Sequence, residues 1–292
     1  MRLGTSLFLL LITTVTASAS PTEEAEGIPH VNQKARASYL DYRYADGHKA
    51  YAIAPGGSWS WVSGAASAEA ASNGALAACG KRTRQRCILY ALNDKVVFDR
   101  NEWVNSWGEG VSESTAPSIE RGTLVGERFP NLAWHDRSGR AGSIEKLQGR
   151  FVFVHFWGSW CPVCMRELPQ IERFQQVLKE RLDDRVQIVL LQVREPFSEG
   201  LGWARENGLA DLPLFDSGAT SGADGSLLLE DGSRIEDRRL ARVFPTSYVL
   251  DPRGVVLFRR NGAIENWNEY LPLLEHAAAH HADKQIARVL SR

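Results

Sequence analysis

The sequence predicts an α/β protein in which a mixed central sheet is flanked by helices and preceded by a small α/β domain. Strand-like and helix-like stretches alternate from residue 123 onward, which is typical of a sheet covered by helices. The run RFVFVHFWG at 150–158 is almost wholly apolar, as expected for a central strand buried on both faces. The polar stretch 107–122 lacks apolar periodicity and predicts a linker between domains at 38–106 and 123–285.

The composition is that of a globular protein, with 43% hydrophobic and 24% charged residues in a chain of 292. The formal net charge of −1 provides no field that would attract nucleic acid or an anionic membrane. We therefore expect neither as a partner, and the sequence contains no pattern that calls for a cofactor.

The first residues have the order of a secretory signal peptide. Arg2 precedes an apolar run at 3–15, and the small residues ASAS follow, so residues 1–19 are predicted to be cleaved. An uncleaved membrane anchor is the alternative, although the apolar run is shorter than the roughly 20 residues of a spanning helix. A periplasmic location follows, and there disulfides persist. We expect residues 20–36, which are polar, to be mobile.

The domain at 38–106 is predicted to contain three short strands and one helix. The strands are AYAIA at 50–54, SWSWVS at 58–63 and CILYAL at 87–92, and the helix lies at 67–79 with Ser67 as its N-cap. We expect Ala70, Leu76 and Ala77 to lie on one face of this helix.

A disulfide between Cys79 and Cys87 would tie the end of this helix to the following strand. Closing a loop of this size contributes about 2.5 kcal/mol in the chain-entropy model, so a structural role is expected, with a second redox site as the alternative. The stretches KAYAIAP, SWSW, GALAAC and CILYALND resemble a small exported domain of unknown function, which implies no chemistry.

The second domain alternates strands with helices. A helix is predicted at 164–182, where Leu168, Ile171, Phe174 and Leu178 recur every three or four residues. Further strands are predicted at 132–135, 186–193, 212–215, 246–251 and 255–260, further helices at 198–207 and 264–279, and an inserted hairpin or loop at 216–235 that borders the substrate groove.

Cys161 and Cys164 stand where the central strand gives way to this helix. Free amide groups and the positive end of the helix dipole favour an anion at that point. A free cysteine has a pKa of about 8.5, and a helix N-terminus lowers it. We therefore expect Cys161, the outer sulfur, to be the nucleophile and Cys164 to resolve its mixed disulfides.

Three stretches resemble the thioredoxin superfamily, specifically its exported TlpA/ResA/DsbE-like members. They are TLVGERFPNLAWHD at 123–136, FVFVHFWGSWCPVCMRELP at 151–169 and VFPTSYVLDPRGVV at 243–256. The resemblance implies a thioredoxin-like fold and a thiol–disulfide oxidoreductase, mainly a reductase of protein disulfides in cytochrome c maturation or a related process. It also implies a membrane electron donor of the DsbD type.

The resemblance further implies roles for single residues. Pro245, between Phe244 and Thr246, would be a cis proline against the disulfide, and its preceding backbone could pair with a substrate strand. Glu167 would accept the proton of Cys164, although a solvated surface glutamate is the alternative.

Other residues would support the redox pair. Trp160, Pro162 and Val163 would surround it or tune its potential. His155 replaces the buried aspartate of thioredoxins and is expected to be a core histidine, with a proton relay to Cys164 as the alternative.

The cysteines and histidines also allow other interpretations. A zinc site built from all four cysteines lacks standard ligand spacing. A copper-binding module that uses the reduced CxxC, or an oxidase that donates disulfides, remains an alternative function. His276 and His280, spaced i, i+4 on a helix, could bind a metal but are expected to be solvated.

Overall fold

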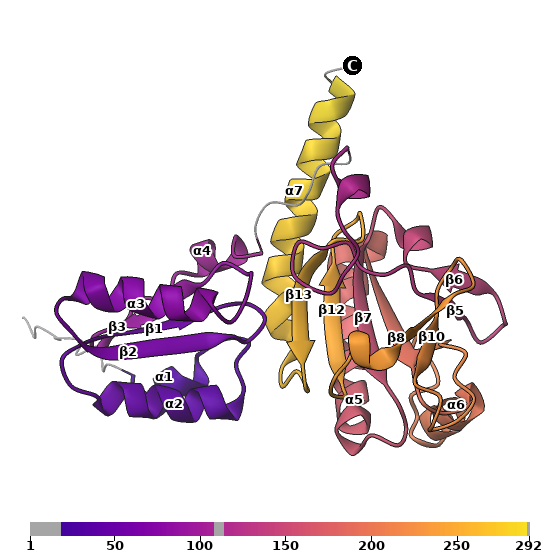
Figure 1. The fold of residues 1–292 in the computed structure, drawn as a ribbon, viewed down its shortest axis with the longest axis horizontal. Helices are drawn as coiled ribbons and strands as arrows, with labels where there is room; N and C mark the ends of the chain where they lie inside the picture. The colour runs from indigo at the N-terminus through magenta and orange to yellow at the C-terminus, as the bar shows by residue number, and fades with distance from the viewer. Residues whose placement is uncertain (1–18, 108–113, 291–292) are drawn as a thin grey trace, which may run out of the picture.

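The computed structural model describes residues 19–107 and 114–290. Residues 1–18 of the predicted signal peptide at 1–19, and residues 108–113 of the predicted linker, lie outside the described residues. The described chain forms a four-stranded sheet, a seven-stranded sheet and a two-stranded hairpin. In Figure 1 the four-stranded sheet lies on the left, the seven-stranded sheet on the right, and α7 (Leu271–Leu290) at the side of the latter that faces the former. Within the described ranges, none of the helices is both long and apolar enough to cross a bilayer.

The N-terminal sheet is antiparallel, in the order β2-β1-β3-β4. Its strands are β1 (His48–Ile53), β2 (Trp59–Ala65), β3 (Ile88–Leu92) and β4 (Lys95–Val96). The helices around it are α1 (Pro21–Glu26), α2 (Gln33–Tyr44), α3 (Ala68–Gly80) and α4 (Arg100–Val104). Figure 1 shows α3 on one face of the sheet, with α1 and α2 on the other.

Alternation along β1 explains how both faces are covered. Ala52 belongs to a buried cluster with Ala71 and Ala75 of α3, and these small side chains let the helix backbone approach the sheet closely. Tyr51 points to the opposite face, where its ring lies 5.2 Å from that of Tyr39 in α2. Of the residues expected on one face of α3, Leu76 packs against this cluster, whereas Ala70 and Ala77 are exposed. An alanine-rich helix has no strong apolar periodicity to reveal its buried face.

The expectation that residues 20–36 are mobile is also wrong. Ser20 and Glu23 form a capping box that starts α1, so the first turn has its own hydrogen bonds. Ile28 and Val31 are fully buried and anchor the segment to the core. The predicted domain start at residue 38 falls inside α2, whose tyrosines pack on the N-terminal sheet.

The C-terminal sheet has the order β13-β12-β7-β8-β9-β5-β6. Strands β7, β8 and β9 are parallel and the remaining pairs are antiparallel, so the sheet is mixed, as predicted. Its strands are β5 (Ala133–His135), β6 (Ala141–Ser143), β7 (Phe151–Trp157), β8 (Val186–Gln192), β9 (Leu214–Asp216), β12 (Thr246–Leu250) and β13 (Val256–Asn261).

The other elements of this half are helices, short 3-10 turns and the predicted hairpin. The α-helices are α5 (Pro162–Leu182), α6 (Phe197–Glu206) and α7. The 3-10 turns are η1 (Ala116–Ser118), η2 (Glu145–Leu147), η3 (Asp183–Arg185), η4 (Asp237–Arg239) and η5 (Trp267–Tyr270). The insertion at 216–235 contains β10 (Ser226–Leu228), which pairs with β11 (Arg234–Glu236) and confirms the hairpin.

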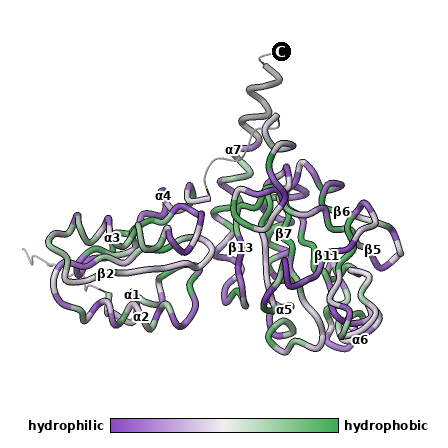
Figure 2. The backbone as a smooth tube through the Cα atoms, viewed as in Figure 1, coloured by the Kyte–Doolittle hydropathy of each residue, from purple (hydrophilic) through white to green (hydrophobic). Residues whose placement is uncertain are grey.

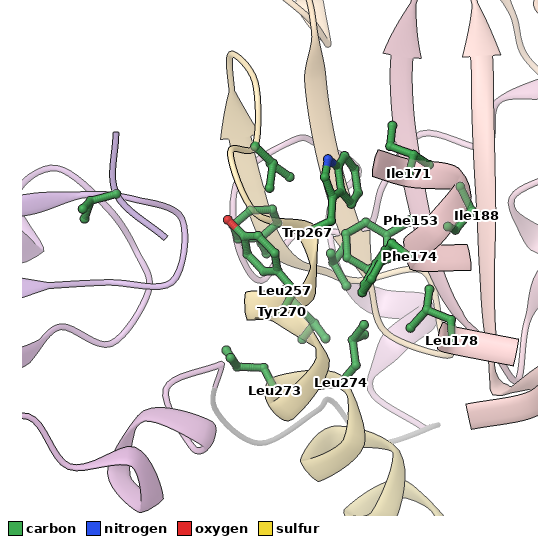
Figure 3. Close-up of a cluster of buried hydrophobic side chains, with 14 of the residues drawn as sticks. Phe153, Ile171, Phe174, Leu178, Ile188, Leu257, Trp267, Tyr270, Leu273 and Leu274 are labelled. Atoms are coloured by element: carbon green, nitrogen blue, oxygen red, sulfur yellow. The ribbon is translucent and has the colours of Figure 1, made fainter. Parts of the chain in front are cut away.

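Every residue of β7 is buried, which explains its unbroken apolar sequence. Phe153 faces α5, where Phe174 meets it edge to face at 5.7 Å, and Trp267 packs against both rings (Figure 3). Val154 and Phe156 point to the other face, into a second buried cluster. Hydrophobic residues accordingly concentrate along β7 and the first turns of α7 in Figure 2.

The two sheets meet at a polar contact centred on His30. Its ring stacks on Tyr270 at 3.9 Å, and its backbone N–H donates to Glu269 Oε2 at 2.7 Å. The buried guanidinium of Arg260 donates to the carbonyl oxygen of His30 at 2.9 Å. Gln85 joins the two sheets as well, since it accepts from Gly56 N–H and donates to the Leu257 carbonyl.

Gly57→Ala is expected to destabilise this contact. Gly57 has φ of +76°, and a Cβ there would lie 1.8 Å from Arg260 Nη1 and 2.7 Å from the His30 carbonyl oxygen. Gly64→Ala is the matched control, because Gly64 has φ of +66° with no atom within 4 Å. Both changes carry the left-handed cost of about 1–2 kcal/mol, and Gly57→Ala adds about 1–3 kcal/mol of overpacking. Urea denaturation measures the difference, and equal loss in the two variants would contradict this packing.

Candidate active site

The CxxC pair sits where β7 ends and α5 begins. Cys161 is the N-cap of α5, Pro162 occupies the first turn, and the Sγ of Cys161 accepts from the N–H of Cys164 at 3.2 Å. The two cysteines form a disulfide with Cα atoms 5.3 Å apart. Cys161 is 5% exposed and Cys164 is fully buried, so an incoming molecule can reach only the outer sulfur.

This location determines how the reduced pair would behave. The first turn of α5 has N–H groups without partners inside the helix, and that of Cys164 donates to the Cys161 sulfur. An anion there is stabilised by these amides and by the helix dipole. The arrangement therefore favours a thiolate on Cys161, while burial disfavours one on Cys164.

A second segment reaches the same edge of the sheet through β12. Thr246 pairs with Phe156 of β7, so Pro245 lies at the level where β7 ends and the CxxC loop begins. The peptide bond between Phe244 and Pro245 is cis. The ring of Phe244 contacts that of Trp160 edge to face at 5.2 Å, which links the two segments directly.

Glu167 lies on α5 about one turn beyond Cys164, and it is 2% exposed. The alternative of a solvated surface glutamate is therefore wrong. One carboxylate oxygen, Oε1, accepts from the backbone N–H of Ile264 at 2.7 Å and from Trp267 Nε1 at 2.9 Å. Burial raises the pKa of Glu167 to about 7 in spite of these hydrogen bonds, so the group can exchange a proton near neutral pH.

His155 is fully buried, and its side chain points to the face of β7 that packs against α5. Its Nδ1 lies 2.9 Å from Ser247 Oγ, and its Nε2 lies 4.0 Å from Glu167 Oε2. Neither His155 Nε2 nor Glu167 Oε2 has a hydrogen-bond partner. Burial lowers the pKa of His155 to about 3, so the imidazole is neutral. A neutral ring adds no charge of its own to the core beside Glu167.

Sequence reasoning missed a second carboxylate near the CxxC loop. Glu195 is 4% exposed, and it accepts from the backbone N–H of Ser159 at 2.6 Å and from its hydroxyl group. Burial raises the pKa of Glu195. Its place after β8 could have identified it, since the carboxyl ends of parallel strands share one edge of a sheet. The partners of Glu167 (Ile264 and Trp267) were also missed, because they lie about 100 residues away in the chain and no local sequence pattern indicates these contacts.

The remaining predicted residues lie apart from this site. Cys79 and Cys87 form their own disulfide in the N-terminal sheet region, so the four cysteines do not converge on one zinc site. The rings of His276 and His280 on α7 lie 3.9 Å apart in a tilted arrangement, with His276 partly exposed and His280 exposed. Within residues 19–107 and 114–290, no group of three or more metal-binding side chains is present.

Comparison with known proteins agrees with this geometry. Residues 124–270 match the protein family described as Redoxin, which is half of the chain. The chain belongs to the Redoxin family. This redoxin is 26% identical over 156 residues to the thiol–disulfide oxidoreductase ResA of Halalkalibacterium halodurans, covering 53% of this chain and 79% of the relative. It is 25% identical over 161 residues to the thiol:disulfide interchange protein DsbE of Xylella fastidiosa, covering 53% of this chain and 72% of the relative.

Among solved structures, this redoxin is similar to a DsbE-type thiol:disulfide interchange protein from Chlorobium tepidum. The match has 20% identity and a TM-score of 0.40, and it covers 53% of this chain and 96% of that one. With the two sequence relatives, the family places this redoxin in the thioredoxin superfamily, among TlpA/ResA/DsbE-like proteins. The chain is a thiol–disulfide oxidoreductase.

Replacing Glu167 by Gln is expected to change how stability depends on pH. The folded-state pKa of about 7 is above the ordinary 4.5, so the contribution of Glu167 is fully present below pH 4.5 and is lost as pH rises through 7. Wild type should therefore lose about 3 kcal/mol relative to the variant between pH 4.5 and pH 8, at about 1.4 kcal/mol per pKa unit. Urea denaturation of both oxidised proteins at several pH values gives this difference, and parallel pH profiles would show that Glu167 ionises normally.

Proposed function

We propose that the chain reduces disulfides in exported proteins through the Cys161–Cys164 couple. The observation that carries this proposal is the position of Cys161 as N-cap of α5, where its sulfur is more accessible than that of Cys164, on the same helix as the buried Glu167. Such a site combines a stabilised thiolate with a nearby group able to take up a proton.

The reaction would proceed in two exchanges. The Cys161 thiolate attacks one sulfur of the substrate disulfide, forms a mixed disulfide with it, and releases the other sulfur as a thiolate. Cys164 then loses its proton and attacks Cys161, which forms the disulfide seen here and releases the second substrate sulfur. The protein dithiol is oxidised, and one substrate disulfide is reduced to two thiols.

Glu167 is the proposed acceptor of the Cys164 proton. Its raised pKa of about 7 suits that task, because a general base is most effective near the working pH. We assign His155 the role of a neutral neighbour, since its Nε2 faces Glu167 Oε2 and its other nitrogen is held by Ser247. The proton relay through His155 stays the alternative role.

The segment around Pro245 is the proposed docking edge for the substrate backbone. The carbonyl oxygen of Val243 accepts from Thr246 Oγ1, and the carbonyl oxygen of Pro245 accepts from Gly262 N–H, which holds the turn in place. The rings of Trp160 and Phe244 are in contact beside it. Pro162 and Val163, which lie between the two cysteines, are proposed to tune the potential of the disulfide.

We also propose that the two sheets belong to separate domains joined by the linker at 107–122, with the Cys79–Cys87 disulfide as a structural staple. A cluster of small apolar residues around Ala52 supports this view, because it gives one face of the N-terminal sheet a core of its own, although the other face shares a buried cluster with the C-terminal half. Export by a cleaved signal peptide and electron supply by a DsbD-type membrane donor complete the proposal. Export rests on the sequence of residues 1–19, and the membrane donor rests on the resemblance of the CxxC and Pro245 segments to the TlpA/ResA/DsbE-like proteins.

Substitution of each cysteine tests the mechanism. Cys161→Ser should abolish reduction of insulin disulfides, because no sulfur remains to attack the substrate. Cys164→Ser should accumulate mixed disulfides that appear on a non-reducing gel, because nothing then displaces the substrate. Full turnover by the Cys161 variant would refute the assignment, and a Cys79→Ala/Cys87→Ala double variant that retains turnover is the control.

The direction of electron flow is tested by equilibration with glutathione. A reductase should have a reduction potential near the value of about −270 mV found in thioredoxin. Quantifying the two redox forms by thiol alkylation gives the potential. A value near the roughly −120 mV of DsbA would instead identify a protein that donates disulfides.

A further inference from the structure

The segment that leads into Pro245 carries exposed arginines, and no part of the proposed mechanism uses them. Arg238, Arg239 and Arg242 are exposed, and none has an ion-pair partner among the described residues. The acidic residue closest to them in the chain, other than Asp237, is Glu236. Positive charge therefore exceeds negative charge along this stretch.

The arginine segment, residues 238–242, is held firmly against the protein. Leu240 and Ala241 are buried, and the exposed arginines stand on either side of this pair in the chain. Asp237, at its start, is 1% exposed and forms a paired contact with the guanidinium of Arg194 in the loop after β8. This pairing neutralises Arg194, so the uncompensated charge lies on the arginine segment itself.

The Phe244 ring connects the arginine segment to the redox site. The guanidinium carbon of Arg238 lies 5.4 Å from the centroid of the Phe244 ring, and that ring contacts Trp160 beside Cys161. Exposed apolar side chains lie on the same approach, since Trp160 is 43% and Val243 is 48% exposed. The surface thus combines an apolar contact area next to the reactive sulfur with a positively charged rim.

We propose that the arginine segment selects polypeptide substrates with acidic side chains near the reacting disulfide. The inference rests on the proposed reductase function and adds the charge of its substrate. Opposite charges across an interface raise association rates and exclude partners of like charge. A polypeptide fits better than a phosphate-rich partner, because the rim borders the exposed apolar surface over the redox pair, where a disulfide must be presented.

The test uses two peptides with the same internal disulfide, one flanked by Asp and Glu and the other by Lys and Arg. Reduced full-length protein is mixed with each, and the second-order rate constant of its oxidation is followed by tryptophan fluorescence or thiol alkylation. We expect the acidic peptide to react about tenfold faster at low ionic strength. This ratio should approach one in 1 M salt, where the screening length is about 3 Å.

A charge-matched pair of variants locates the effect. The triple substitution Arg238→Gln/Arg239→Gln/Arg242→Gln should remove the preference and leave the insulin reductase activity. Arg100→Gln/Arg150→Gln/Arg173→Gln, which removes the same charge elsewhere, should keep the preference. Equal wild-type rate constants for the two peptides, an unchanged preference in the first variant, or arginine-dependent binding to anionic vesicles without peptide preference would overturn the inference. Failure of wild type to reduce insulin and both peptides would instead overturn the proposed function.

Discussion

The antiparallel pairing of β12 with β7 is the constraint on which the active site depends. β7 ends at the loop that carries Cys161, and β12 begins immediately after Pro245. Because Thr246 is in register with Phe156, both ends reach the same edge of the sheet. A slip of one residue in this pairing would turn every side chain of β12 to the opposite face and break the contact between the two segments.

Burial of both faces of β7 specifies that register, and burial also determines the protonation of Glu167. The same apolar packing that holds the strand surrounds Glu167 and removes it from water. Two hydrogen bonds to its Oε1 hold the side chain in place, but they do not cancel the cost of burying its charge. The site therefore trades some stability above neutral pH for a carboxyl group that can exchange protons.

The N-terminal sheet connects to this region through β13 and η5. Arg260 in β13 donates to the His30 carbonyl, and Tyr270 of η5 stacks on the His30 ring. Trp267, in the same η5 turn, donates to Glu167. The η5 turn thus contacts His30 of the N-terminal half through Tyr270 and the Glu167 carboxylate through Trp267.

Several features could be predicted from local sequence because local physics decides them. The apolar run of β7, the spacing along α5 and the CxxC at their junction fixed the position of Cys161 in advance. In α3, by contrast, alanines occur on all sides of the helix, so the sequence does not indicate which face is buried. The tertiary structure shows that Ala71 and Ala75 are buried in a cluster with Ala52. The ordered segment before residue 38 was missed because its polar sequence hides a capping box and buried anchors.

What sequence alone determined is the strand–helix order and the reactive pair, since both follow from periodicity and from the polarity of a helix end. The tertiary structure decided the environment of that pair. Glu167 meets Ile264 and Trp267, His155 meets Ser247, and these partners are brought together by the sheet and by η5. Hydrogen bonds and desolvation act across space, so residues far apart in the chain determine the protonation of Glu167.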